Sequence, residues 1–251
     1  METQQQDATA AVDALVGALA AFDVIDLSPV LGPDVPRFAT HPEIQIVERT
    51  RTIPLHGFGM QTLILPEHVG PHVDAPAHVL ADRPDATVDT LAPTALWGRA
   101  VKVDLGRREL QAGELVDVDE LLAAAGAGIR EGDVVLIDFG WSRHLRPGGR
   151  GAAWWGLNTP GLTERACREL RDLGVRAVCS DSSTCDCSVV DGEMVAAYGH
   201  AEHFLPNDIS IVECLDGLDR VPGLSYFAAT PLRIRHGSGS PLRPIALVPR
   251  G

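Results

Sequence analysis

The feature of this sequence that most restricts its fold is a short segment, EHVGPHVDAPAH, which runs from Glu67 to His78. Pro71 and Pro76 exclude a continuous helix here, because proline lacks an amide hydrogen and its ring collides with the preceding turn. Gly70 removes a side chain beside Pro71 and lets the backbone approach closely. The segment is therefore expected to be extended and irregular.

Four side chains of this segment have a spacing that suits an extended backbone. His68, His72, Asp74 and His78 follow one another at intervals of 4, 2 and 4 residues. Side chains alternate between the two faces of an extended chain, so even spacing directs all four to the same side. The pattern predicts that imidazoles and a carboxylate converge on one point.

The residue types in this pattern indicate a metal site. Two imidazoles and a carboxylate, here His68, His72 and Asp74, are a typical ligand set for a catalytic divalent ion with positions left open for water and substrate. Such an ion can lower the pKa of water to about 7. His78 would then serve as general acid or base, because an imidazole titrates near neutral pH. The alternative is that these are unrelated surface or packing histidines.

Length and composition favour one domain that folds without help from a metal. The chain has 251 residues, 45% of them hydrophobic and 22% charged, and it contains no repeat or linker. A chain of this size buries enough surface to fold alone, so a bound metal would serve chemistry. We expect an N-terminal helix or arm over residues 1–22 and a single catalytic domain over residues 23–251.

Hydrophobic patterning predicts a mixed α/β domain with a sheet or barrel-like core and few helices. Helices are expected over 10–22, 118–123, 163–173 and 200–206, with Thr163 as an N-cap. Strands are expected over 24–28, 51–55, 61–65, 99–105, 133–139, 175–179, 209–213, 226–229 and 244–248. No GxxxxGK[ST] or GxGxxG motif is present, so the sequence does not indicate a nucleotide fold.

Charge and cysteine content restrict the partners and the compartment. The formal net charge is -13, which disfavours nucleic acid and anionic membranes as partners. Residues 1–22 lack the basic start of a signal peptide, and no apolar stretch approaches about 20 residues. The five cysteines are an odd number in a chain without an export signal, which predicts reduced thiols and a cytoplasmic location. The CxC pair, Cys185 and Cys187, is weak evidence for a metal site, and ordinary thiols are the simpler interpretation.

The segment from His68 to His78 resembles the HxGTHxDxPxH signature of the cyclase family of metal-dependent hydrolases. This family includes bacterial kynurenine formamidase, isatin hydrolase and trans-dienelactone hydrolase. The resemblance extends along most of the chain, through the segments Asp26–Ser28, Gly132–Ser142, Pro160–Leu162, Asp181–Asp186, Ile211–Leu218 and Gly239–Leu247. It implies a swivelling β/β/α-type fold and one or two zinc or manganese ions. Family members commonly form homodimers or homotetramers.

The resemblance also implies which residues hold the metal. His68, His72 and Asp74 would bind the first ion, and a downstream His and Glu would join Asp74 around a second. Glu213 matches the family Glu. Its His partner is either His203, which we favour slightly, or the neighbouring His200; if neither reaches the site, one ion is expected.

Two departures from the family pattern are expected to alter substrate choice without abolishing metal binding. Pro71 and Phe139 stand where the family usually has Thr, and each exchanges a polar group for an apolar one. With Phe139, the tryptophans Trp141, Trp154 and Trp155 are candidates for an aromatic or apolar substrate pocket. The alternative for the tryptophans is packing in the core or a dimer interface.

The sequence is compatible with three functions. The first is hydrolysis of an amide, formamide, lactam or lactone in a small cyclic or aromatic substrate by metal-activated water, with His78 moving protons. The second is a metal-dependent cyclisation or dehydration in secondary metabolism. The third is a metal-stabilised binding or scaffold protein without catalysis.

Overall fold

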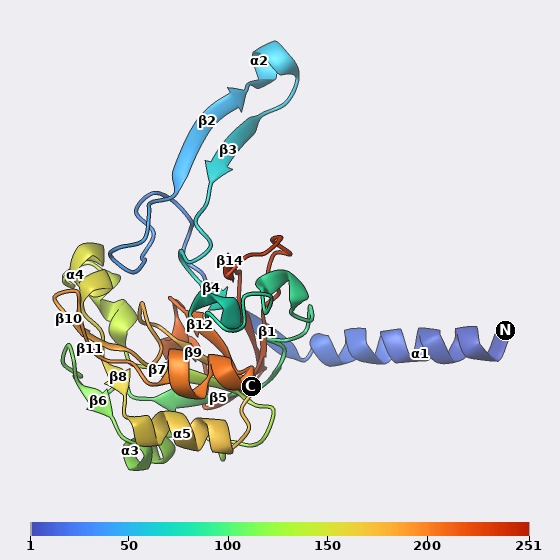
Figure 1. Ribbon diagram of the computed structural model, residues 1–251. Helices are drawn as coiled ribbons and strands as arrows, with labels where there is room; N and C mark the ends of the chain where they lie inside the picture. Colours follow the sequence, from blue (N-terminus) through green and yellow to red (C-terminus); the bar gives the residue numbers. More distant parts are fainter. Residues whose placement is uncertain (1, 251) are drawn as a thin grey trace.

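Nine strands form one mixed sheet in this structure, a computed structural model that describes residues 2–250, without the side chains of residues 2–6 and 48–50. The strands are β1 (Phe22–Asp26), β4 (His72–Asp74), β5 (Gly98–Asp104), β7 (Val134–Asp138), β9 (Ala177–Ser180), β12 (Ser210–Glu213), β13 (Leu224–Ala228), β14 (Gly239–Pro241) and β15 (Ile245–Pro249). Their order is β1-β15-β13-β5-β7-β9-β12-β4-β14 (Figure 1). The central strands β5, β7, β9 and β12 are parallel, so their carboxyl ends lie at one edge.

The short connection between β14 and β15 requires this sheet to curl. The two strands are seven positions apart in the strand order, which would be about 34 Å in a flat sheet. Only residues 242–244 join them, and that link spans at most about 14 Å. The sheet is therefore a curled half-barrel, and the prediction of a mixed α/β domain with a barrel-like core and few helices is confirmed.

The core has two layers because side chains of the central strands alternate between the two faces of the sheet. Val135 and Ile137 pack into one cluster of buried apolar residues with Trp141 and Leu170. Val134 and Leu136 pack into a second cluster, on the other face of the sheet. Both faces are buried, as the near-continuous apolar sequence of β7 predicts.

Outside this sheet, the described residues form five α-helices and three two-stranded sheets. The helices are α1 (Glu2–Leu19), α2 (Ile53–His56), α3 (Val118–Ala124), α4 (Ala152–Leu157) and α5 (Glu164–Asp172); the strand pairs are β2 (Gln45–Arg51) with β3 (Met60–Ile64), β6 (Leu115–Val116) with β8 (Gly161–Leu162), and β10 (Ser188–Val190) with β11 (Glu193–Ala196). The Thr163 hydroxyl accepts a hydrogen bond from the amide of Ala166, which confirms the N-cap of α5.

Three local predictions needed correction. The strand expected over 51–55 is wrong, because β2 ends at Arg51 and a short helix follows with Pro54 in its first turn, where proline fits. The N-terminal helix begins at Glu2, earlier than expected, and Phe22 belongs to β1. The segment Gly239–Leu247, which resembles the terminal strand of the family, holds β14 and the start of β15, because the chain crosses there between distant positions of the sheet.

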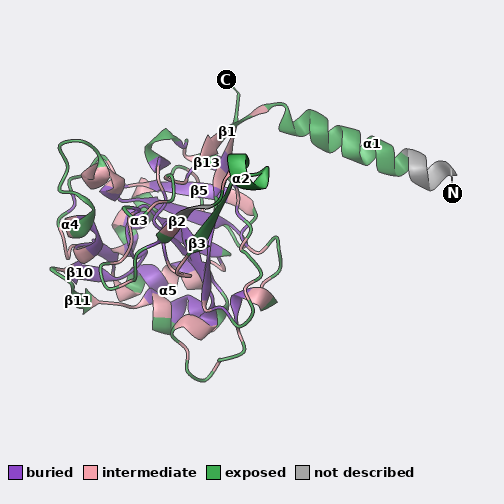
Figure 2. Cartoon of the chain, turned by 90° about the horizontal axis from the view of Figure 1, so that it is seen from above, coloured by how far each residue is buried: buried purple, intermediate pink, exposed green. Residues whose placement is uncertain are grey.

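Two parts of the chain project from the curled sheet: helix α1 and the β2–β3 hairpin with α2 at its tip (Figures 1 and 2). Both have exposed apolar side chains, among them Leu15 and Val16 on α1, and Leu55, Phe58 and Leu63 on the hairpin arm. No helix among the described residues has the length and hydropathy needed to cross a membrane.

Candidate metal centre

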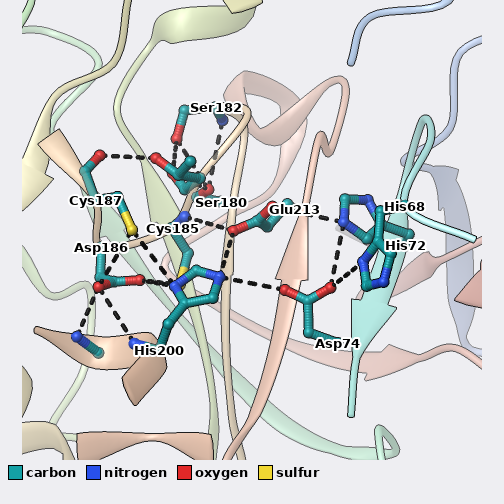
Figure 3. A network of polar contacts seen from close by, with 12 residues as sticks. His68, His72, Asp74, Ser180, Ser182, Cys185, Asp186, Cys187, His200 and Glu213 are labelled. Atoms are coloured by element: carbon teal, nitrogen blue, oxygen red, sulfur yellow. Dashed lines mark hydrogen bonds and ion pairs between the residues drawn. The ribbon is translucent and has the colours of Figure 1, made fainter. Parts of the chain in front are cut away.

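Two antiparallel strands of the sheet bring two carboxylates and an imidazole together. His72 and Asp74 lie on β4, where alternation places both side chains on one face. Glu213 ends β12 and is paired in register with His72. The Nε2 atom of His72 lies 3.4 Å from Oδ1 of Asp74 and 3.5 Å from Oε2 of Glu213 (Figure 3).

A second imidazole, from His200, reaches the same carboxylates from the other side. Its Nε2 atom is 3.3 Å from Oδ2 of Asp74 and 3.4 Å from Oε1 of Glu213. The amide of Cys185 donates a hydrogen bond of 3.0 Å to Oε1 of Glu213 and fixes that carboxylate. We call His72, Asp74, Glu213 and His200 the metal cluster; the first three are almost fully buried, and the side chain of His200 is 12% exposed.

The geometry of this cluster fits a divalent ion. In a tetrahedral site with bonds of about 2.0–2.2 Å, neighbouring ligand atoms lie about 3.3–3.6 Å apart, and the four separations above fall in that range. Oδ2 of Asp74 is buried without a hydrogen bond. Among the residues that the structure describes, neither carboxylate pairs with Lys or Arg. Two buried carboxylates without a fixed cation require another source of positive charge.

Without a metal, histidine protons would have to supply that charge. Burial disfavours the charged form of His72, but its contact with Asp74 outweighs this and raises the pKa of His72 well above its usual value. The pKa of His200 is raised in the same way, against its burial, by Asp186 and Asp74. Burial and the charge of Asp74 raise the pKa of Glu213. The cluster therefore binds positive charge strongly, whether protons or a metal ion.

Both imidazoles are oriented by their second nitrogen. The Nδ1 atom of His72 lies 2.8 Å from the carbonyl oxygen of Gly70, a contact that requires a proton on Nδ1 and leaves Nε2 free to bind a metal. Gly70 has a φ of 57°, in the left-handed region that favours glycine, and this turn directs its carbonyl towards the ring. The Nδ1 atom of His200 is held by Asp186 at 2.5 Å.

Asp186 also shapes the turn that carries His200. One of its oxygens accepts hydrogen bonds from the amides of Gly199, at 2.6 Å, and His200, at 3.4 Å. This turn, residues 199–203, is a single π-helical turn, a feature frequent at functional sites. A Cβ atom at position 199 would lie 2.7 Å from the carboxyl carbon of Asp186, so only glycine fits there.

His203, which the sequence favoured slightly over His200, lies outside the metal cluster. Its Nε2 is 3.1 Å from a carboxylate oxygen of Glu164, and Arg171 donates to its Nδ1 at 3.0 Å. Both partners belong to α5. The π-turn directs His200 and His203 to different sides, so only His200 faces Asp74. His200, rather than His203, is therefore the candidate histidine partner of Glu213 in the metal cluster.

His68 and His78 border the metal cluster, and their rings stack with centroids 4.0 Å apart. Nδ1 of His68 lies 2.6 Å from Oδ1 of Asp74, and its Nε2 lies 2.8 Å from the hydroxyl of Ser238. Burial lowers the pKa of His78 to about 4, so this imidazole is neutral at physiological pH. All four groups expected to converge from the segment 67–78 thus lie together.

The aromatic residues expected around a substrate occupy the core instead. Phe139, Trp141 and Trp155 are almost completely buried in the cluster of apolar residues between the sheet and the helices. The indole of Trp141 donates a hydrogen bond of 2.7 Å to the carbonyl of Asn158. Only Trp154 is partly exposed, with the guanidinium of Arg150 4.4 Å from its ring centre. The expectation of an aromatic substrate wall therefore does not fit Phe139 and Trp155, while Trp141 and Trp154 line a cavity of about 360 Å³ outside the metal cluster.

Some residues of the site were missed by sequence reasoning. Asp186 appeared only as the middle of the CxC pair and as the end of the matching segment Asp181–Asp186, without a role of its own. It is the carboxylate that holds His200, and the amides that it binds come from residues 13 and 14 positions later in the chain. The Cys187 thiol is 3.5 Å from Nδ1 of His200, while all five cysteines are free and buried. The sequence does show an aspartate, Asp186, between two cysteines, which is an unusual position for a charged residue. Nothing in a single sequence, however, indicates that this aspartate contacts His200.

A curled mixed sheet with imidazoles and carboxylates gathered at its strand ends defines a metal-dependent hydrolase of the cyclase class. Residues 25–187 match the family model described as "Putative cyclase", and the chain belongs to that family.

Individual proteins that are similar to this chain include several isatin hydrolases. The chain is 26% identical to an isatin hydrolase from Roseibium aggregatum, over 91% of this chain and 92% of the relative. It is similar to the crystal structure of an isatin hydrolase bound to the product analogue thioisatinate, with a TM-score of 0.82, 25% identity and coverage of 98% and 99%. An isatin hydrolase A from Ralstonia solanacearum gives a TM-score of 0.79 and 29% identity, with coverage of 94% and 97%.

Proposed function

We propose that this protein is a metal-dependent hydrolase that cleaves the carbon–nitrogen bond of a small cyclic amide, of which isatin is the first candidate. The observation that supports this most strongly is the metal cluster, in which Asp74 and Glu213 face the Nε2 atoms of His72 and His200 at 3.3–3.5 Å without a Lys or Arg partner among the described residues. The isatin hydrolase relatives, which align over nearly the whole chain, give the substrate class.

The metal cluster and His78 divide the work of such a reaction. A divalent ion held by the cluster would polarise the substrate carbonyl and lower the pKa of water. His78 is neutral and half-buried beside His68, so its free nitrogen can take a proton from the attacking water. As the carbon–nitrogen bond breaks, the imidazolium returns this proton to the leaving nitrogen. The products are a carboxylate and an amine.

The number of ions and their identity are part of the proposal. Asp74 directs Oδ1 to His72 and Oδ2 to His200, so His72 and Asp74 would hold one ion, and Asp74, Glu213 and His200 would hold a second. His68 would join the first ion if its contacts with Asp74 and Ser238 were exchanged. Nitrogen and oxygen ligands in this set suit zinc or manganese. Metal analysis of the purified protein gives both answers.

The direct test is an activity screen on metal-loaded protein with isatin, N-formyl arylamines and lactones, in zinc and in manganese. We expect turnover of at least one cyclic amide, abolished by a chelator and restored by the ion. The mass of the product separates this reaction from the alternative: hydrolysis adds one water, whereas dehydrative cyclisation removes one. Turnover that a chelator does not affect would contradict the proposal.

We propose in addition that the protein acts as a homodimer or homotetramer in the cytoplasm. Exposed apolar side chains on α1 and on the hairpin arm, such as Leu55, Phe58 and Leu15, favour burial against another copy. Five free cysteines suit a reducing compartment. Light scattering of the purified protein measures the oligomeric state, and a monomer at all concentrations would contradict that part.

A further inference from the structure

The only lysine of this chain, Lys102, is buried in the middle of strand β5, with 7% of the residue exposed. Its ammonium group is poorly satisfied by the protein. The nearest acceptors are the carbonyl of Leu218 at 3.4 Å and the carboxylates of Asp104 and Asp138, both at 3.6 Å. Charge-assisted hydrogen bonds are normally about 2.7–2.9 Å long. A buried ammonium with three donors and no short contact has capacity for a further acceptor.

This ammonium faces a cavity of about 850 Å³, outside the metal cluster. The cavity lies beyond the carboxyl ends of the parallel strands β5 and β7, the usual position of ligand sites in α/β sheets. Its charged lining consists of the cationic Lys102, Arg107, Arg143, Arg146 and Arg220, and the acidic Asp104, Asp138 and Asp219. Cations thus exceed carboxylates by two here, although the whole chain carries a net charge of -13.

Two of the arginines are free to bind a ligand. Within the described part of the chain, the guanidinium of Arg143 donates only to the carbonyl of Gly106, at 3.3 Å, and that of Arg220 only to the carbonyl of Asp26, at 2.7 Å. Neither has a carboxylate within 4.0 Å in the described part of the chain. Arg146, in contrast, is paired with Asp216, and Arg107 is paired with Asp104. The unpaired guanidiniums are therefore the best anion-binding groups of this cavity.

We propose that this cavity is a second ligand site, which binds a small oxyanion, a carboxylate or a phosphate, between Lys102, Arg143 and Arg220. Guanidinium groups bind such oxyanions through two parallel hydrogen bonds, and the lysine adds a point charge at the floor of the cavity. The three carboxylates of the lining restrict the site to one anionic group that lies among the cations.

This site lies next to the metal cluster along the sheet. The strand β9 alone separates β7 from β12 in the strand order. The carboxylate of Asp181, directly after β9, accepts hydrogen bonds from the amides of Phe139 at 3.0 Å and Ser142 at 2.8 Å. It thereby fixes the start of the loop that carries Arg143.

The test is a titration of the metal-loaded protein with inorganic phosphate and, separately, with acetate, followed by calorimetry. We expect saturable binding of at least one anion. The anion with the lower dissociation constant shows whether the site prefers a phosphate or a carboxylate. In the double variant Arg143→Gln/Arg220→Gln the dissociation constant should rise about tenfold or more, because two charge-assisted contacts are lost. This variant leaves the metal cluster unchanged, so binding of the anion at the metal would persist in it.

The matched control is Arg165→Gln/Arg168→Gln, which removes the same charge from helix α5, away from the cavity, where both arginines pair with acidic residues. This control should bind the anion as the unmodified protein does. The proposal is overturned if neither anion binds at tens of millimolar, if the cavity variant binds as tightly as the unmodified protein, or if both variants lose affinity equally. These outcomes do not depend on the substrate of the metal cluster.

Discussion

The metal cluster and the Lys102 cavity each hold a pair of carboxylates on the same sheet. The two sites differ in the cation that balances the negative charge of these carboxylates. In the cavity, Asp104 and Asp138 share the ammonium of Lys102, a permanent charge that the chain supplies. In the metal cluster, the only ionisable partners of Asp74 and Glu213 among the described residues are imidazoles, whose charge depends on pH. The first arrangement is complete without a cation from solution, and the second is not. The comparison teaches that the fixed cation, rather than the number of carboxylates, indicates whether a metal is needed.

The largest expected effect is the loss of catalysis when the metal cluster is broken. His72→Ala removes a nitrogen ligand, so metal content should fall sharply and kcat/KM should fall by about 1000-fold or more, the effect of losing metal-activated water. Elemental analysis and the hydrolysis assay measure this. Glu164→Gln, which changes the partner of His203, is the control. If His72→Ala kept its full metal content and the kcat/KM of the unmodified protein, His72 would not be a metal ligand and the metal cluster would not differ from the Lys102 cavity in this way.

Removal of the fixed cation should affect stability instead. Lys102→Met leaves the buried carboxylate of Asp138 without its ammonium, which should lower the free energy of unfolding by about 3–5 kcal/mol. Adding Asp138→Asn removes the unpaired charge and should recover most of this loss. Urea unfolding of the two variants measures both numbers. Equal stability of Lys102→Met and the unmodified protein would show that Asp138 does not depend on the lysine.

A smaller effect is expected from the carboxylate behind His200. Asp186→Asn keeps the shape of the side chain but no longer selects a proton on Nδ1 of His200, so metal affinity should fall about 10–100-fold. Competition with a chelator measures the affinity, and nitrogen NMR of labelled histidine reports the tautomer. Unchanged affinity together with an unchanged tautomer would exclude a positioning role for Asp186.

The smallest effect concerns the pH dependence of stability. Burial, and then the charge of Asp138, raise the pKa of Asp181 to about 7. The folded protein therefore holds this proton more tightly than the unfolded chain, and the associated stability is present at low pH and is lost as the pH rises to about 7. From about pH 6 to about pH 8, the unmodified protein should lose about 1 kcal/mol more than Asp181→Asn. Identical pH profiles of the two proteins would contradict this assignment.

The part of the metal cluster that lies in one segment could be predicted from the sequence. The prolines and the even spacing of His68, His72, Asp74 and His78 are local constraints, and local constraints are visible in one sequence. The choice between His200 and His203 was not visible, because it depends on a π-turn whose amides bind Asp186, 13 residues earlier in the chain. The resemblance identified Glu213, but its register with His72 follows only from the folded sheet.

The fold was predictable to a similar degree. Apolar runs such as 133–139 and the N-cap at Thr163 identified strands and helices of the core. The aromatic residues were misplaced because a loop with Trp141 and Trp155 looks the same in sequence whether it lines a pocket or fills a core. The Lys102 cavity has no sequence motif, because its cations come from strand β5 and from the segments after β5, β7 and β12, which are far apart in the sequence.

The single lysine also provides a built-in sensor of unfolding. A protease that cuts only after lysine has one site in this chain, and that peptide bond lies within β5, hydrogen-bonded between β13 and β7. Cleavage therefore requires the sheet to open at its centre. The cleavage rate reports how often this opening occurs. The fragments would comprise residues 1–102 and 103–251, which separates the histidine-rich segment from the strand that carries Glu213.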